Sequence, residues 1–291
     1  MSRVSFRSPY TFYGLEKQSH ASSRVVIFPV PYEGTISYQH GASEGPRAII
    51  TASRQIELFD VELRRSVPDL GIYTMPELEP SAHSVRETLD AVRTVSAANI
   101  KKGKFQVMLG GEHSITLGAV EALADRYRNL SVLQLDAHSD LRESYEGSPY
   151  NHACVMRRCL EIVPRIVQVG IRSQDKEEAE YIQSSKRTPD VFIAPEIQTK
   201  KILSRLTPRV YVTIDVDVFD SSVIAATGTP EPGGLDWYGV TSLLRAVAKS
   251  ATIVGADIVE LAPIPGNAAS DFTAAKLVHK LIMYRYYKRI L

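Results

Sequence analysis

The stretch SVLQLDAHSD, Ser131 to Asp140, joins a short apolar run to a cluster of acidic and imidazole side chains. The apolar run is typical of a strand that is buried on both faces of a parallel sheet. Ligands of open parallel sheets bind beyond the carboxyl ends of the strands. This stretch therefore predicts both a fold class and the edge of the sheet where the chemistry takes place.

The same pattern extends in both directions, because short β-branched runs alternate with longer segments of helical periodicity. That alternation is typical of an α/β protein whose central, mostly parallel sheet is covered by helices on both faces. We expect strands at 25–30, 106–109, 131–135, 165–170, 191–194, 210–214 and 252–258. We expect helices at 46–56, 84–98, 114–126, 151–160, 176–183, 237–248 and 271–286, with Asp236 and Ser270 as candidate N-caps for the last two.

No linker rich in Pro, Gly or Ser divides the chain, so we expect a single domain over residues 1–291. The 34 Lys and Arg residues nearly balance 33 Asp and Glu residues, which argues against a nucleic-acid-binding protein. Cys154 and Cys159 provide no disulfide framework and indicate a reducing compartment. The polar N-terminus and the lack of a long apolar run predict a cytoplasmic protein with no membrane partner.

Acidic and imidazole residues follow four of the predicted strands. They are His113, Asp136, His138, Asp140, Asp215, Asp217 and Glu260. Alternate residues of an extended chain point to one side, so residues 136, 138 and 140 should share a face, as should 215 and 217. Each short motif alone is more often a turn, a cap or a core residue. Their joint occurrence at one edge of one sheet favours a metal site.

Four carboxylates in one cleft would repel each other unless a cation neutralised them, and two divalent ions would offset their charge. Oxygen and imidazole ligands without a thiolate favour a hard or borderline ion such as Mn²⁺, while Zn²⁺ and Fe²⁺ remain compatible. A pair of ions can lower the pKa of a shared water and supply hydroxide, which indicates a hydrolase. Glu112 does not alternate with His113 and is interpreted as a structural or outer residue.

Several motifs resemble the signature segments of the ureohydrolases, the family of arginase, agmatinase, guanidinobutyrase and formimidoylglutamase. The resemblance extends from the segment 31–50 to residues 260–263 and is carried by GGEHS (110–114), DAHSD (136–140), TIDVD (213–217) and GTPEPGG (228–234). It departs from the family pattern at Asp220-Ser221, where the family has aspartate-proline, and at Ala225-Ala226. These departures leave every candidate ligand in place and put only the rigidity of the loop in question.

The resemblance implies a three-layer α/β/α arginase-like fold with two Mn²⁺ ions per subunit. By motif, one ion would be held by His113, Asp136, Asp140 and Asp215, and the other by Asp136, His138, Asp215 and Asp217. Asp136 and Asp215 would bridge them, and a metal-bridging hydroxide would attack the guanidinium carbon. The resemblance also implies a homotrimer or homohexamer.

Two further residues receive roles. Glu260 is the candidate catalytic and substrate-binding acid, because a carboxylate can accept two parallel N–H bonds from a guanidinium ion. His152 corresponds by resemblance to a loop histidine that shuttles protons, and it is the second catalytic and substrate-binding candidate. The alternatives are that Glu260 is a charge at the end of its strand that faces water, and that His152 is a helix-capping or surface histidine.

The segment after Asp140, LRESYEG at 141–147, resembles the agmatinase branch of the family. We therefore expect agmatine as the substrate, with urea and putrescine as products, and Glu143, Glu146 or Asp175 as acids near its amine. Arg142 weakly supports guanidinobutyrate. The alternatives are another guanidino or formimino substrate, such as arginine, and a metal-binding scaffold without catalytic activity.

Overall fold

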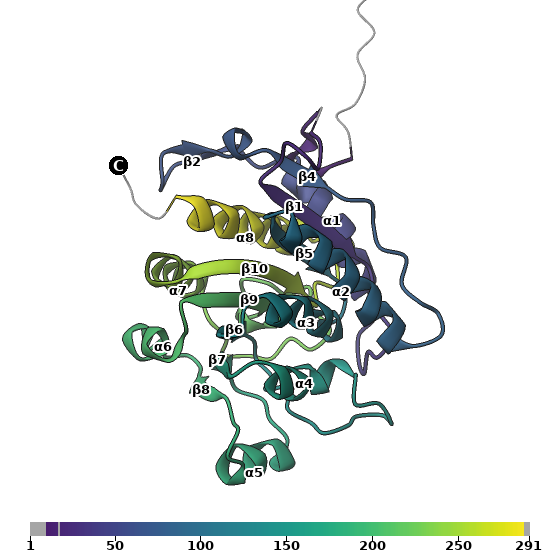
Figure 1. Ribbon diagram of the computed structural model, residues 1–291, viewed down its shortest axis with the longest axis vertical. Coiled ribbons are helices and arrows are strands. Elements are labelled where there is room, and N and C mark those ends of the chain that lie inside the picture. The colour runs from purple at the N-terminus through teal and green to yellow at the C-terminus, as the bar shows by residue number, and fades with distance from the viewer. Residues whose placement is uncertain (1–9, 17, 288–291) are drawn as a thin grey trace, which may run out of the picture.

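The computed structural model describes residues 10–16 and 18–287, and over these residues it forms an eight-stranded sheet whose paired strands are all parallel (Figure 1). The ends of the predicted range 1–291 lie outside the described residues. The strands are β1 (Val25–Val30), β4 (Ile72–Thr74), β5 (Phe105–Gly110), β6 (Leu130–Leu135), β7 (Arg165–Ile171), β8 (Asp190–Ile193), β9 (Arg209–Asp215) and β10 (Thr252–Val259). Their order in the sheet is β4-β1-β5-β10-β9-β6-β7-β8. The predicted α/β class is confirmed.

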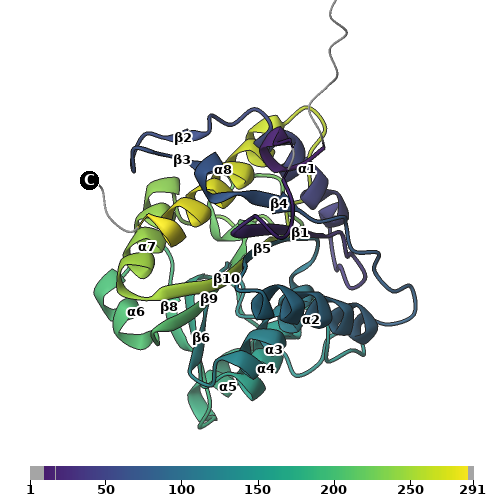
Figure 2. The same ribbon diagram turned by 45° about the horizontal axis from the view of Figure 1, so that its top comes forward.

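Helices cover both faces of the sheet, which gives the three layers visible in Figure 2. The helices are α1 (Gly45–Ser53), α2 (Val85–Lys101), α3 (Thr116–Arg126), α4 (Val155–Ile162), α5 (Lys176–Ser184), α6 (Thr199–Arg205), α7 (Trp237–Ser250) and α8 (Ala268–Tyr286). Helices α1, α6, α7 and α8 pack on one face, and α2, α3 and α4 on the other. Within the described residues, no helix has both the length and the apolar character needed to cross a membrane.

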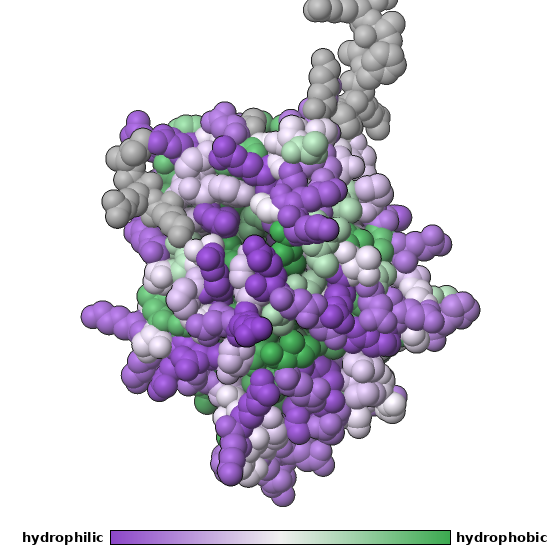
Figure 3. Space-filling model, in the orientation of Figure 1, coloured by the Kyte–Doolittle hydropathy of each residue, from purple (hydrophilic) through white to green (hydrophobic). Residues whose placement is uncertain are grey.

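The side chains of each strand alternate between two cores, as the two-residue period of a strand requires. In β9, Val210 and Val212 enter the core under α7 and α8, whereas Tyr211 enters the core under α2, α3 and α4. Outside these cores, hydrophilic side chains cover most of the face shown in Figure 3. The apolar strand patterns predicted from the sequence are therefore explained by burial on both faces.

Four elements escaped the sequence-based prediction because they are too short to show a period. They are β4, helix α6 and the antiparallel pair β2 (Phe59–Asp60) and β3 (Arg65–Ser66). The predicted N-cap Asp236 is confirmed, since its side chain accepts from the backbone N–H of Gly239 at 2.6 Å. The prediction of Ser270 as an N-cap was wrong: α8 begins at Ala268, and the Asn267 side chain caps it.

A buried polar network joins β2 and the residues after it to α8. The ammonium group of Lys280 donates to the carboxylates of Asp60 and Glu62, each at 2.8 Å. Nε2 of His279 lies 3.1 Å from Asp60, and its Nδ1 lies 2.9 Å from the hydroxyl of Tyr13. Because Asp60 can only accept, His279 donates from Nε2 and accepts the Tyr13 proton at Nδ1. This network explains how His279 and Lys280 are tolerated inside the protein.

Candidate metal centre

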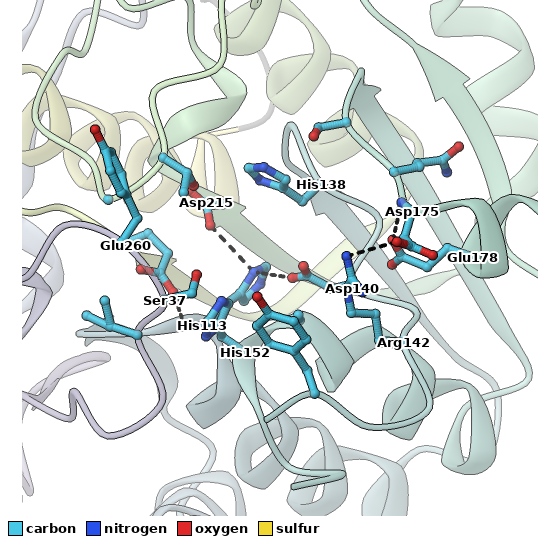
Figure 4. Close-up of a pocket in the computed structure, with 18 of the residues that line it drawn as sticks. Ser37, His113, His138, Asp140, Arg142, His152, Asp175, Glu178, Asp215 and Glu260 are labelled. Carbon is cyan, nitrogen blue, oxygen red and sulfur yellow. Dashed lines mark hydrogen bonds and ion pairs between the residues drawn. The ribbon is translucent and has the colours of Figure 1, made fainter. Parts of the chain in front are cut away.

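The candidate residues gather at the carboxyl ends of β5, β10, β9 and β6, which are consecutive in the sheet. His113 follows β5, and its ring lies against residues that follow β6. Its Nδ1 is 3.1 Å from an oxygen of Asp136, 3.1 Å from an oxygen of Asp140 and 3.7 Å from an oxygen of Asp215. The structure thus brings three separate segments of the chain to one point, as Figure 4 shows for His113, Asp140 and Asp215.

A second group lies on the other side of Asp136. Nδ1 of His138 is 2.9 Å from an oxygen of Asp217 and 3.7 Å from an oxygen of Asp136. Among the described residues, two sets have ligand atoms close enough to share one ion: His113 with Asp136 and Asp140, and Asp136 with His138 and Asp217. Because Asp136 belongs to both sets, the geometry suits two ions with a shared carboxylate.

The donor set fits divalent cations. Nδ1 of His113 is fully buried and has no hydrogen-bond partner, although three carboxylates surround it. Burial, together with the charge of Asp136, raises the pKa of Asp140 to about 7. Burial and the charge of Asp217 also raise the pKa of Asp215 well above its usual range. A cation would supply the missing partner of His113 and offset the repulsion between the carboxylates.

The local backbone differs from the extended chain assumed in the sequence analysis. Asp217 lies in a 3₁₀ turn, and its N–H donates to the side chain of Asp215 at 2.9 Å. Asp140 has a φ of 53°, in the left-handed region that non-glycine residues rarely adopt. The residues expected to share a side do meet at one site, but the extended backbone assumed for them was wrong at Asp140 and Asp217. Turns after the strands aim the side chains instead.

The two groups open into a cavity of about 250 Å³. Six of the eight predicted ligand and catalytic residues line it, namely His113, His138, Asp140, His152, Asp215 and Glu260 (Figure 4). Asp136 and Asp217 are buried behind this surface. Other lining residues received no individual role in the sequence analysis; they include Ser37, Tyr38, Gln39, Tyr145 and Thr229. Tyr145 and Thr229 lie in the segments that carry the family resemblance, whereas residues 37–39 show no metal-ligand spacing.

Glu260 is held rigidly at the base of the cavity. One of its oxygens accepts the backbone N–H of His113 at 2.6 Å, and its own N–H donates to the carbonyl of Gly111 at 2.8 Å. Its φ of 65° lies in the left-handed region. Burial raises the pKa of Glu260 well above its usual range, with the charge of Glu112 adding to the effect. Strain of this kind persists where the surrounding structure enforces it, often at functional sites.

His152 is fixed by a short chain of hydrogen bonds. Its Nδ1 lies 3.2 Å from the hydroxyl oxygen of Thr35, and that hydroxyl donates to Glu112 at 2.8 Å. Because the Thr35 proton is directed to Glu112, Thr35 can only accept from His152, which places the imidazole proton on Nδ1. Burial lowers the pKa of His152 to about 4. Glu112 also accepts from the backbone of residues 34 and 35, in agreement with its structural interpretation.

The three acids expected near the amine of the substrate, Glu143, Glu146 and Asp175, have different surroundings. Asp175 lines the cavity, where its carboxylate lies 3.4 Å from Arg142. Glu143 is instead paired with Arg157 at 2.7 Å and with Arg158 at 2.9 Å, and neither Glu143 nor Glu146 is a cavity residue. Arg142 therefore already has an acidic partner, which weakens its support for a substrate carboxylate.

The loop that begins at Asp220, where the sequence departs from the family pattern, is held by several hydrogen bonds. The Asp220 carboxylate accepts from the backbone and hydroxyl of Ser222 at 3.0 and 2.6 Å, and from the backbone of Gly233 at 3.0 Å. The Gly234 N–H lies 3.3 Å away. These hydrogen bonds provide the order that a proline after Asp220 would otherwise contribute.

Comparison with known proteins identifies the family. The model of the Arginase family matches residues 23–284. An N(1)-aminopropylagmatine ureohydrolase of Synechocystis sp. is 42% identical over 91% of this chain and 90% of its own length. An agmatinase of Bacillus anthracis is 33% identical over 91% of this chain and 94% of its own. The agmatine ureohydrolase structure of Thermoplasma volcanium superposes with a TM-score of 0.86 at 34% identity, covering 93% of this chain and 92% of that one. The chain belongs to the Arginase family, whose members hydrolyse guanidino C–N bonds, and the expected family and arginase-like fold are confirmed.

Proposed function

We propose that this member of the Arginase family is a dinuclear hydrolase of an agmatine-type guanidino amine. The observation that carries this proposal is the pair of ligand sets sharing Asp136 beside a cavity that also contains Glu260. The products would be urea and a free amine, which is putrescine if the substrate is agmatine.

The proposed ligands are His113, Asp136, His138, Asp140, Asp215 and Asp217. Mn²⁺ is the proposed ion because the donors are carboxylate oxygens and imidazole nitrogens, with no thiolate among them. Bound there, two divalent cations would lower the pKa of a water molecule and polarise the guanidinium. His113 and Asp140 would present their lone pairs to one ion, and His138 and Asp217 to the other.

Glu260 would orient the substrate. A guanidinium ion is planar and stays protonated, so it is best held by a carboxylate that accepts two N–H bonds side by side. The carboxylate of Glu260 is fixed by the His113 N–H at 2.6 Å and points into the cavity. Its position would set the angle at which water approaches the guanidinium carbon.

His152 would move a proton to the departing amine. With its proton on Nδ1 and its pKa lowered to about 4, the imidazole is neutral near pH 7 and has its lone pair on Nε2. It must therefore take up a proton at Nε2 before it can donate one. This is the behaviour of a shuttle, and Thr35 would hold the ring in the orientation that allows it.

Two substrates are supported by different observations. The segment 141–147 supports agmatine, as expected from the sequence, and the agmatinase of B. anthracis agrees with it. The relative from Synechocystis, at 42% identity, favours N(1)-aminopropylagmatine. Both are polyamine-like cations, and the carboxylate of Asp175 would attract their amines across the cavity from Glu260.

The test is urea release by the Mn²⁺-loaded protein from agmatine, N(1)-aminopropylagmatine, arginine and guanidinobutyrate, with formamide release from formimidoylglutamate measured alongside. We expect turnover of one or both agmatine compounds at least 100-fold above the rest. Asp175→Asn should raise the KM for the amine substrates, whereas Glu143→Gln, which removes an acid outside the cavity, should not. Preferred turnover of arginine, or no product from any compound, would contradict the proposal.

A further inference from the structure

A buried carboxylate that the proposed mechanism does not use lies behind the candidate metal centre. Asp257 is on β10 and has no exposed surface. One of its oxygens accepts the hydroxyl of Tyr211 at 2.6 Å and the hydroxyl of Thr116 at 2.8 Å. Its other oxygen is also buried and has no hydrogen-bond partner among the described residues. A buried carboxylate with one unpaired oxygen is costly, which makes this residue a candidate for a functional role.

Asp257 connects to the metal centre through Thr213. Thr213 and Asp257 are register partners on the adjacent strands β9 and β10. The hydroxyl of Thr213 lies 3.4 Å from that of Thr116 and 2.8 Å from Nε2 of His113. His113 therefore has one ring nitrogen facing the carboxylates of the metal centre and the other facing this hydroxyl.

The direction of the hydrogen bonds follows from which groups can donate. A carboxylate only accepts, so Tyr211 and Thr116 both donate to Asp257. Thr116 has then used its one proton, and it can only accept from Thr213. Thr213 can donate its proton to Thr116 and accept from Nε2 of His113, which leaves the lone pair of His113 on Nδ1. In the opposite direction Thr213 would donate to Nε2, and the imidazole proton would lie on Nδ1 beside the carboxylates of Asp136 and Asp140.

We propose that Asp257 is a positioning residue that acts through Thr116 and Thr213 to fix the tautomer of His113, which keeps Nδ1 available to a cation. This inference rests on the proposed function, because it assumes that an ion binds at His113. Metal-ligating histidines commonly donate their second N–H to an acceptor that sets their orientation and basicity. Here the acceptor is the hydroxyl of Thr213, and a second hydroxyl, that of Thr116, links it to the carboxylate of Asp257.

The second histidine gives an internal comparison. His138 is partly exposed, and its Nε2 lies 3.9 Å from the carboxylate of Glu231, beyond hydrogen-bonding distance. His113 thus has a buried support that His138 lacks. The ion at His138 should accordingly be removed first when a chelator is added to the wild-type protein.

The test compares four variants of the full chain. Thr213→Val removes the hydroxyl that contacts His113, and Thr213→Ser retains it. Asp257→Asn removes the negative charge at the end of the chain and leaves an amide that can donate as well as accept. Tyr211→Phe is the matched control, because it removes a buried hydroxyl from Asp257 that is not on the path to His113.

Two measurements are made on each variant and on the wild-type protein. Bound Mn²⁺ per chain is measured over a graded chelator series, and histidine ¹⁵N shifts are recorded on metal-free protein, with the His113 signal assigned by its loss in His113→Gln. Thr213→Val and Asp257→Asn should lose affinity for one of the two ions by about 10-fold to 100-fold. They should also gain protonation at Nδ1. Thr213→Ser and Tyr211→Phe should resemble the wild type in both measurements.

The outcomes separate the two proposals. Equal Mn²⁺ affinity and equal tautomer in Thr213→Val and Thr213→Ser would overturn the role of this chain. A wild-type protein that binds no divalent ion would overturn the proposed function, while the ¹⁵N shifts would still report the tautomer. If Asp257→Asn does not fold, as judged by circular dichroism, the Thr213 pair still decides the question.

Discussion

Glu260 and Asp140 are non-glycine residues that hold left-handed backbone conformations, with φ of 65° and 53°. Each follows a strand whose end is fixed in the centre of the sheet, and each presents its carboxylate to the cavity. The fold thus maintains an unfavourable conformation at two positions where the direction of one side chain matters. At the residue scale, Glu260 gives the most direct test of substrate orientation.

Replacing Glu260 with glutamine should lower kcat/KM by about 100-fold. The amide keeps an oxygen for the His113 N–H but loses the charge that holds the guanidinium, and a hydrogen bond to a charged group contributes about 1.5–3 kcal/mol. Steady-state urea release gives the kinetic constants, and elemental analysis should find the metal content unchanged. Full activity in Glu260→Gln would remove this residue from the site.

The sequence alone was sufficient to nominate the residues that gather at the candidate centre, because they follow strands and recur at short spacings. It could not assign a role to Thr35, Thr213 or Asp257. Thr35 is 117 positions from His152, and Asp257 is 141 positions from Thr116. Contacts between such distant segments depend on strand order and register, which no local pattern reports.

At the scale of elements, α8 is joined to β2 and the residues after it by the buried Asp60 network. Asp60→Asn should destabilise the protein by about 3 kcal/mol, because Lys280 loses one of its two buried carboxylate partners and His279 loses a charged acceptor. Thermal or denaturant unfolding measures the change. Glu180→Gln, which removes one partner of an exposed pair with Lys176, should change the stability by less than about 0.5 kcal/mol.

The same network predicts a pH dependence. Although burial opposes ionisation, hydrogen bonds from His279 and Lys280 hold the pKa of Asp60 well below its usual value of 3.8. A lowered folded-state pKa stabilises the protein above the unfolded value, and this stabilisation is lost as the pH falls. The advantage of the wild type over Asp60→Asn should be constant above about pH 5 and shrink below about pH 4. A difference that stays constant down to pH 3 would contradict the assignment.

The longer elements were predictable, since a buried strand or an amphipathic helix leaves a repeating pattern. Strand β1 was predicted with its observed bounds, 25–30. Helix α8 was predicted three residues too short at its start, because Ser270 was mistaken for the cap provided by Asn267. The three-residue β4 was missed because it is too short to show a repeating pattern, and its pairing with β1 joins residues 47 positions apart.

At the scale of the whole molecule, the sheet connects distant parts of the chain. Strand β10 lies between β5 and β9, so residues 252–259 complete the sheet between residues 105–110 and 209–215. We propose that the chain is one domain, as the unbroken alternation of elements predicted. Separately expressed halves, 1–150 and 151–291, should fail to give folded protein by circular dichroism and NMR. A half that folds alone would show two domains.

The central claim is that two divalent cations share Asp136 between His113 and His138. Crystals grown with Mn²⁺ and measured by anomalous diffraction test it directly. The account predicts two anomalous peaks in each chain, one touching His113, Asp136 and Asp140 and the other touching Asp136, His138 and Asp217. A single peak, or none at these side chains, would contradict it.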